Sequence, residues 1–130
     1  MGTTVLIADD AEWSAVTLEV LALTLPDVRV VRAGDGQEAW RLTEEQPVAA
    51  IITDLRMPRM DGFELIERVR AKATEADIPI IVVTADGAPE TQSRAQRLGA
   101  NAFFVKPYSP AAVRATLKEL LNDTQPDADF

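Results

Sequence analysis

Five polar residues of this sequence lie at the ends of short apolar runs, and their types suit one kind of chemistry. They are Asp9, Asp10, Asp54, Thr84 and Lys106. Three carboxylates in a chain without histidine or cysteine form a set of hard oxygen ligands, which favours Mg²⁺. A carboxylate beside Mg²⁺ and a lysine is a suitable nucleophile toward phosphorus. If these side chains meet in the fold, they indicate formation of an aspartyl phosphate.

The apolar runs that carry these residues alternate with longer amphipathic segments. The runs are rich in Val and Ile, and they predict strands at Thr4–Ala8, Val28–Val31, Val48–Thr53, Ile78–Thr84 and Ala102–Val105. Such uninterrupted runs are typical of parallel strands covered on both faces. The other segments predict helices at Glu12–Leu25, Gly36–Glu45, Gly62–Lys72, Pro89–Leu98 and Pro110–Leu121. This strict alternation predicts an α/β fold, a doubly wound parallel sheet of five strands with five helices.

Local signals mark where several of these helices begin and end. Asp35 and Asp61 are suited to cap helix N-termini, and Pro89 and Pro110 are suited to a first helical turn. Gly99 stands where a helix would stop. Both kinds of signal agree with the predicted boundaries.

The predicted sheet would gather the five polar residues on one rim, because ligands of open parallel sheets bind beyond the carboxyl ends of the strands. Taken singly, each residue has an ordinary explanation as a cap, a strand terminus or a surface charge. Their joint occurrence at four strand ends favours a shared site. Three carboxylates within ~5 Å repel by on the order of 3 kcal/mol per pair at an effective dielectric constant near 20. Such a cluster needs a cation or must take up a proton.

Composition excludes several other classes of protein. The chain has 130 residues, enough for one domain, and its 13 Lys and Arg against 21 Asp and Glu give a net charge of −8. This charge disfavours binding to nucleic acid and to anionic membranes. The absence of cysteine and histidine rules out disulfides, thiolate chemistry, zinc sites of the usual kind and a Ser-His catalytic pair.

The chain carries no signal for membrane insertion or export. No apolar run approaches the ~18 residues of a membrane span, and the N-terminus lacks the basic region of a signal peptide. We therefore expect a cytoplasmic protein. Residues 1–122 are predicted to form the domain, and residues 123–130 an acidic, disordered tail.

Over residues 4–122 the sequence resembles the receiver domain of two-component response regulators. The resemblance is carried by four segments in this order. They are Ile7-Ala8-Asp9-Asp10, the stretch from Asp54-Leu55-Arg56-Met57-Pro58 to Gly62, Val83-Thr84-Ala85, and the stretch from Gly99 to Lys106-Pro107. The family has the strand order 2-1-3-4-5. The chain is closest in kind to single-domain, chemotaxis-regulator-like members.

The resemblance implies a role for each residue of the rim. Asp54 would accept phosphate from a phosphohistidine of a sensor histidine kinase or histidine phosphotransfer protein. Asp9, Asp10 and Asp54 would hold Mg²⁺ together with the backbone carbonyl of Arg56. Lys106 would contact the phosphoryl group, and Thr84 would donate a hydrogen bond to it.

The resemblance also implies a conformational switch. As Thr84 moves toward the phosphoryl group, the ring of Phe103 would turn inward and change a surface that binds a downstream protein. Phe103 as a simple core residue is an equally good interpretation. The family also implies a cis bond between Lys106 and Pro107. Such a protein is a phosphorylation-switched signalling module rather than an enzyme, apart from its own phosphotransfer and autodephosphorylation.

Two charged residues beside the motifs suggest control of phosphoryl lifetime. Arg56 stands two residues after Asp54, and Asp86 two residues after Thr84. Our hypothesis is that they pair across the site and limit the approach of water to the acyl phosphate. Two solvated loop charges are the competing interpretation, and an exposed pair would contribute little stability.

The sequence also leads to expectations for the two tryptophans and for one departure from the family's motifs. Trp13 is expected to pack with Val16 and Val20, or alternatively to be exposed as an anchor for a phosphodonor. Trp40 is predicted to lie in the core.

Asn101-Ala102 replaces the paired acidic residues of family members that dimerise on DNA, which argues against that charge-paired dimer here.

Two other functions use parts of the same pattern. A Mg²⁺-dependent aspartyl-phosphate phosphohydrolase would want a second Asp two residues after the nucleophile, where this chain has Arg56. A flavodoxin-like nucleotide or flavin binder would want Gly, Ser and Thr after the first strand, where this chain has Asp9 and Asp10. Among receivers, a phosphate shuttle or sink without its own output, and a receiver excised from a longer protein, also remain open. A DNA-binding output is not expected, because the chain has no basic helical domain.

Overall fold

A sheet of five parallel strands lies between two layers of helices. The computed structural model describes residues 2–72 and 77–123. Its elements are β1 (Thr3–Ala8), α1 (Glu12–Leu23), β2 (Val28–Ala33), α2 (Gly36–Glu45), β3 (Ala50–Thr53), α3 (Gly62–Ala71), β4 (Ile80–Thr84), α4 (Pro89–Leu98), β5 (Ala102–Val105) and α5 (Pro110–Asp123). The strand order is β2-β1-β3-β4-β5, with every neighbouring pair parallel. The predicted fold class and strand order are confirmed.

Several boundaries differ by two residues from the predicted ones. Helix α1 ends at Leu23, whereas α5 continues to Asp123, so that the first residue of the predicted tail is helical. The rest of that tail, residues 124–130, lies outside the described residues. Strands β3 and β4 begin two residues later than predicted. Val48 explains the difference for β3, because it is buried although it precedes the strand. An apolar run in the sequence indicates which residues are buried, and buried residues continue beyond those that form the hydrogen bonds of the sheet.

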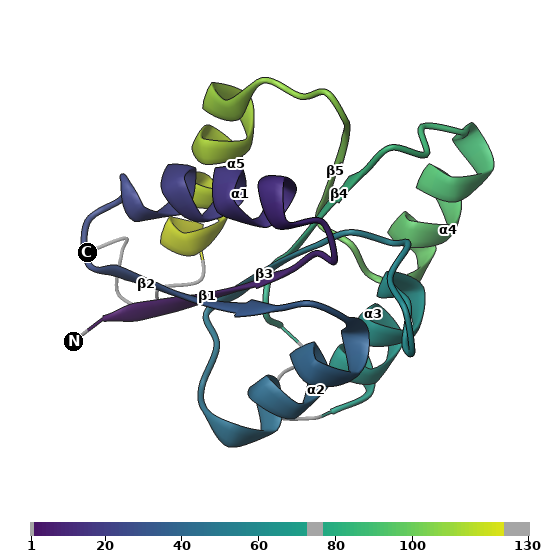
Figure 1. The fold of residues 1–130 in the computed structure, drawn as a ribbon, viewed down its shortest axis with the longest axis horizontal. Coiled ribbons are helices and arrows are strands. Elements are labelled where there is room, and N and C mark those ends of the chain that lie inside the picture. The colour runs from purple at the N-terminus through teal and green to yellow at the C-terminus, as the bar shows by residue number, and fades with distance from the viewer. Residues whose placement is uncertain (1, 73–76, 124–130) are drawn as a thin grey trace.

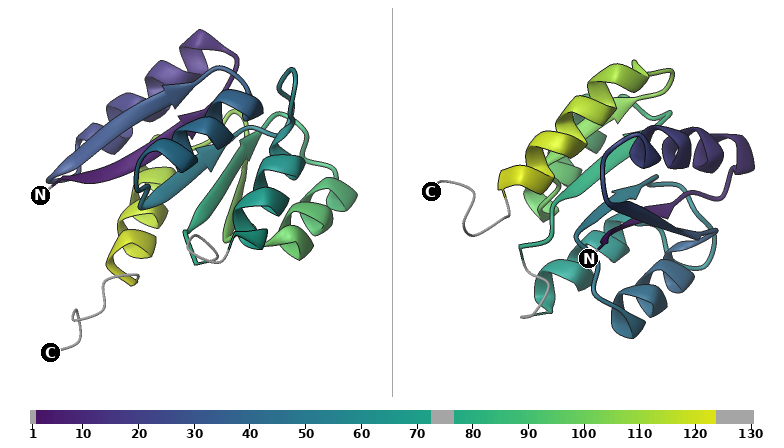
Figure 2. Two further views of the ribbon diagram at one scale, coloured as in Figure 1. Left: turned by 90° about the horizontal axis from the view of Figure 1, so that it is seen from below. Right: turned by 90° about the vertical axis from the view of Figure 1, so that its left-hand side faces the viewer.

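The two faces of the sheet carry different helices, as Figures 1 and 2 show: α1 and α5 cover one face, and α2, α3 and α4 cover the other. Alternation along the central strand β1 divides its side chains between the two faces. Leu6 and Ala8 belong to the core beneath α2, α3 and α4, whereas Val5 and Ile7 belong to the core beneath α1 and α5. All four are fully buried. Strand β1 therefore has no alternating polar residues because helices cover both faces of the sheet.

The helix signals in the sequence act as predicted. The carboxylate of Asp35 accepts a hydrogen bond from the Glu38 amide (2.7 Å), and that of Asp61 accepts one from the Glu64 amide (2.9 Å). Pro89 occupies the first turn of α4. Gly99 ends the same helix with a φ of 120°, which is strained for residues with a side chain. No helix within residues 2–72 and 77–123 is long and apolar enough to cross a bilayer.

The loop between β3 and α3 is fastened to the start of α2 at two points. The second oxygen of Asp35 accepts hydrogen bonds from Arg59 Nε (2.9 Å) and Nη2 (2.6 Å), while Arg59 itself adopts a φ of 68°. The amide of Gly36 donates to the Met60 carbonyl oxygen at 3.0 Å. A Cβ atom on residue 36 would lie only 2.0 Å from that oxygen. The backbone approach therefore requires glycine at this position.

We predict that Gly36→Ala lowers the free energy of unfolding by about 2 kcal/mol, because the added methyl group must push the Met60 backbone away. Urea unfolding followed by circular dichroism measures the change. Gly34→Ala is the matched control, since its Cβ would meet nothing closer than Glu38 Oε1 at 4.0 Å. Equal midpoints for the two variants would contradict the explanation.

Candidate functional site

The register of the parallel strands brings the predicted site residues to one edge of the sheet. Ala8 at the end of β1 pairs with Thr53 at the end of β3, and Thr84 of β4 pairs with Val105 of β5. The chain continues in register beyond these pairs. The Asp54 amide donates to the Ala8 carbonyl oxygen at 2.9 Å, and the Lys106 amide donates to that of Thr84 at 2.8 Å.

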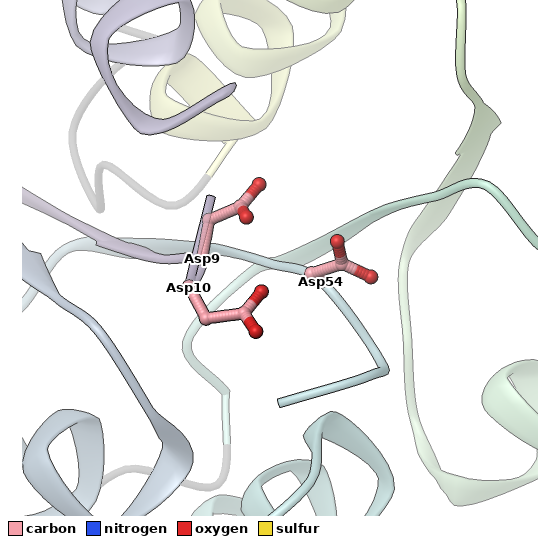
Figure 3. Close-up of side chains that lie close together, drawn as sticks. All are labelled: Asp9, Asp10 and Asp54. Atoms are coloured by element: carbon pink, nitrogen blue, oxygen red, sulfur yellow. The ribbon is translucent and has the colours of Figure 1, made fainter. Parts of the chain in front are cut away.

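Three carboxylates gather where β1 and β3 end. One oxygen each from Asp9, Asp10 and Asp54 lies within 4.8 Å of the others, and Figure 3 shows the three side chains together. Asp9 and Asp54 are buried, with 3% and 8% of their surfaces exposed, whereas Asp10 is exposed. Carboxylate oxygens at this spacing fit a hard divalent cation, with Asp10 on the side open to solvent.

Lys106 joins two of these carboxylates. Its Nζ atom donates to Asp54 Oδ2 at 2.9 Å and to Asp9 Oδ2 at 3.1 Å. Burial by itself would lower the pKa of Lys106, but the hydrogen bonds and charges of Asp54 and Asp9 outweigh it and raise the pKa above its ordinary value. Lys106 is therefore a fixed positive charge at neutral pH. The peptide bond between Lys106 and Pro107 is cis, as the resemblance implies.

The backbone around Asp54 orients its carboxylate. Oδ1 accepts hydrogen bonds from the amides of Leu55 (2.6 Å) and Arg56 (3.3 Å), while Oδ2 accepts from Lys106. Gly62 packs against the main chain here, because a Cβ atom on it would lie 2.2 Å from the Asp54 carbonyl oxygen. Both carboxylate oxygens of Asp54 therefore accept hydrogen bonds, which fix the side chain at this edge of the sheet.

Thr84 and Phe103, the predicted switch pair, lie on the two neighbouring strands at the far side of the site. Thr84 is fully buried, and its hydroxyl oxygen accepts a hydrogen bond from the Asp86 amide at 3.3 Å. Phe103 is half-buried and packs against the core beneath α2, α3 and α4. It also lines a small hollow of about 130 Å³ between α4 and β5, beside Gln92 and Gln96. The ring thus touches both the core and the surface.

Arg56 and Asp86 face each other across the mouth of the site. Arg56 Nη2 donates to Asp86 Oδ2 at 2.7 Å, with the arginine side chain 70% exposed and the aspartate 27% exposed. The Ala88 amide, together with Arg56 and Thr91, lowers the pKa of Asp86 below its ordinary value. The pairing expected from sequence is present, and the carboxylate is ionised at neutral pH.

Sequence reasoning missed two hydroxyl groups that contact the site. Thr91 Oγ1 donates to Asp86 Oδ2 at 2.8 Å, the oxygen that Arg56 also uses. Ser14 Oγ donates to Asp9 Oδ2. Both residues lie in the first turns of helices that follow strand ends, and this position is the only signal in the sequence that could have drawn attention to them.

The two tryptophans have different environments. The expected packing of Trp13 with its helix neighbours is wrong: 84% of the residue is exposed, and Val20 and Leu23 on the same helix are 60% and 49% exposed. Helix α1 buries its other face, which explains why Trp13 is left outside. Trp40 packs against the core as predicted, although it is only partly buried, with Lys72 Nζ 5.4 Å from its ring centroid.

Asn101, which stands in place of an acidic residue, is engaged within the chain. Its Oδ1 atom accepts hydrogen bonds from Arg70 Nη2 (2.9 Å) and from the Ile80 amide (2.8 Å). Arg70 also donates to the carbonyl oxygens of Gly99 and Ile78. Asn101 therefore ties the starts of β4 and β5 to α3.

Comparison with known proteins agrees with this geometry. Residues 5–118 match the response regulator receiver domain. The chain belongs to the receiver domain family. Over 117 residues it is 35% identical to a chemotaxis protein CheY homologue of Campylobacter jejuni, a match that covers 89% of this chain and 90% of the relative. The receiver domain is a module of two-component signalling, so the family expected from the sequence is confirmed.

Solved structures of receiver domains superpose over almost the whole chain. A putative response regulator from Chloroflexus aurantiacus is 31% identical with a TM-score of 0.85, covering 93% of this chain and 98% of its own. The receiver domain of a sensor histidine kinase from Pseudomonas aeruginosa is 27% identical with a TM-score of 0.83 and the same coverage. That structure has a magnesium ion coordinated in its active-site cleft. None of these similarities supports a phosphohydrolase, a flavodoxin-like binder or a shuttle without output.

Proposed function

We propose that Asp54 of this receiver domain accepts a phosphoryl group from a phosphohistidine, and that the phosphorylated form binds a downstream protein. One observation carries the proposal: the Asp9, Asp10 and Asp54 carboxylates meet within 4.8 Å, and Lys106 bonds two of them. In the transfer, a carboxylate oxygen of Asp54 forms a bond to phosphorus while the bond to the donor imidazole breaks. The electrons of the broken nitrogen–phosphorus bond stay on the donor imidazole, whose nitrogen takes up a proton as it leaves, and Asp54 keeps the phosphoryl group as an acyl phosphate.

The residues of the site fit Mg²⁺ as cofactor. Asp9, Asp10 and Asp54 supply carboxylate oxygens, and the Arg56 backbone carbonyl is the further ligand that we propose. When bound, Mg²⁺ neutralises charge on the phosphoryl oxygens and on the crowded carboxylates. Lys106 then holds a phosphoryl oxygen, and the hydroxyl of Thr84 turns from the Asp86 amide to donate to another. Phe103 follows into the space that Thr84 leaves.

We predict that incubation with acetyl phosphate and Mg²⁺ adds the mass of one phosphoryl group to the wild-type protein and none to Asp54→Asn. Intact-protein mass spectrometry under mildly acidic conditions measures the adduct before it hydrolyses. Removal of Mg²⁺ with EDTA is expected to abolish labelling of the wild type. Labelling of both proteins, or of neither, would refute Asp54 as the acceptor.

The ion pair of Arg56 and Asp86 is proposed to lengthen the life of the acyl phosphate. The pair spans the mouth of the site, and Asp86 is itself held by the Ala88 amide (3.1 Å) and Thr91 (2.8 Å). A guanidinium held in this place obstructs the path of water toward Asp54.

We predict that Arg56→Ala speeds autodephosphorylation about fivefold, the equivalent of roughly 1 kcal/mol, which is the upper range for an exposed ion pair. The rate is measured by the decay of the phosphorylated form after acetyl phosphate is removed in excess Mg²⁺. Arg68→Ala is the matched control, because it removes another exposed ion pair, Arg68–Glu64 at 3.0 Å on α3. An unchanged rate for Arg56→Ala would show that the pair does not protect the acyl phosphate.

Trp13 is proposed to anchor the phosphodonor, a sensor histidine kinase or histidine phosphotransfer protein. The exposed ring stands three residues after Asp10, and the apolar residues Val20 and Leu23 continue its face along α1. Val20 also lines an apolar groove of about 520 Å³ between α1 and α5. An exposed aromatic side chain next to a reactive carboxylate is a typical anchor for a protein partner.

We predict that Trp13→Ala slows phosphotransfer from the protein donor about tenfold, or roughly 1.4 kcal/mol. Phosphorylation by acetyl phosphate should stay unchanged, because this small donor does not need the anchor. Trp13→Phe, which retains an aromatic ring, should recover most of the rate. Radiolabel transfer from the phosphorylated donor measures both variants, and a normal rate for Trp13→Ala would rule out the anchor.

The output surface is proposed to include α4, β5 and α5, where Phe103 reaches the hollow beside Gln92 and Gln96. The downstream partner is a protein rather than nucleic acid, given the net charge of −8. A dimer paired through acidic residues of β5 is not part of this proposal, because Asn101 is bonded to Arg70 and Ile80. We propose residues 1–122 as the working domain, acting in the cytoplasm.

A further inference from the structure

Asp9 is the most enclosed carboxylate of the site. Its side chain has no exposed surface, so its oxygens depend on partners within the protein. Oδ1 accepts a hydrogen bond from the Ala11 amide at 2.9 Å. Oδ2 accepts from Lys106 Nζ at 3.1 Å and from the hydroxyl of Ser14. Each of these donors fixes the direction of a group that would bind Mg²⁺.

The bond from Ser14 is unusual for a hydroxyl residue within a helix. Such residues commonly donate to a backbone carbonyl of the preceding turn. Thr17 and Thr24 of the same region do so, Thr17 to the Trp13 carbonyl oxygen at 2.9 Å and Thr24 to that of Leu21 at 2.6 Å. Ser14 instead donates to a side chain five residues earlier, outside the helix. The hydroxyl therefore serves the site rather than the helix.

Ser14 also differs from Lys106 in what it can bond. Lys106 divides its hydrogen bonds between Asp9 and Asp54, and in the proposed function it turns to the phosphoryl group. Asp9 would then lose its lysine partner at the moment when its orientation matters most. Within the described residues Ser14 donates to Asp9 and to neither of the other two site carboxylates, so its bond does not depend on the position of Lys106.

We propose that Ser14 is a positioning residue for Mg²⁺, holding the Asp9 carboxylate in the direction that the cation requires. This inference rests on the proposed function, because it concerns the same metal site. Groups that hydrogen-bond a metal ligand without touching the metal typically change affinity by about 10- to 100-fold. Alanine favours helix at least as well as serine, so Ser14→Ala removes the hydroxyl without threatening α1.

The test is Mg²⁺ binding by isothermal titration calorimetry to the full chain, without phosphodonor. Ser14→Ala is expected to weaken Mg²⁺ binding about tenfold. Ser14→Thr, which keeps the hydroxyl, should bind Mg²⁺ within about threefold of wild type on the same argument. Thr17→Ala is the matched control, because it removes a hydroxyl one turn further along α1 that points to the backbone, and it should leave Mg²⁺ binding unchanged.

The outcomes separate this inference from the proposed function. Wild-type affinity in Ser14→Ala would overturn the inference while leaving Mg²⁺ binding and Asp54 phosphorylation intact. A loss in Ser14→Thr or Thr17→Ala as large as in Ser14→Ala would also overturn it, because the hydroxyl on Asp9 would then not be the cause. Failure of wild type to bind Mg²⁺ would overturn the metal site itself, and this inference with it.

Discussion

Repulsion between carboxylates is the constraint on which the rest of the site depends. The register of β1 and β3 places Asp9 and Asp54 side by side, and Asp10 follows at once in the chain. At ~5 Å and an effective dielectric constant near 20, each pair of charges costs on the order of 3 kcal/mol. Lys106, which directly follows β5, offsets part of this cost, and a divalent cation would offset more. The surrounding fold holds together a cluster that its charges alone would disperse.

Backbone amides and a residue in the first turn of a helix orient the carboxylates of the cluster. The amides of Leu55 and Arg56 orient Asp54, and the Ala11 amide with Ser14 orients Asp9. All of these donors come from the few residues after a strand end, where the chain turns into a loop or helix. Their dipoles and hydrogen bonds stabilise negative charge without adding a second flexible cation.

The sequence predicted the sheet, the strand order by resemblance, and the meeting of Asp9, Asp54 and Lys106, because strand ends in a parallel sheet share one edge. It did not predict Ser14 or Thr91, since which hydroxyl reaches a carboxylate depends on the rotation of α1 and α4 about their axes. Trp13 was misjudged for a related reason. Helix α1 is apolar on both faces, with Leu18 buried on one and Val20 exposed on the other, so periodicity could not tell which face packs.

The loop that follows Asp54 is held unequally on its two sides. Toward α2 it is joined by the buried Asp35 carboxylate and by a backbone bond at Gly36, where no side chain has room. Toward α4 it is joined by the side-chain ion pair of Arg56 and Asp86, whose carboxylate is more exposed than that of Asp35, 27% against 9%. A more exposed ion pair contributes less stability. The loop is therefore held more firmly on the side of α2 than on the side of α4. When a change at Asp54 displaces this loop, the displacement is therefore expected to reach α4 rather than α2.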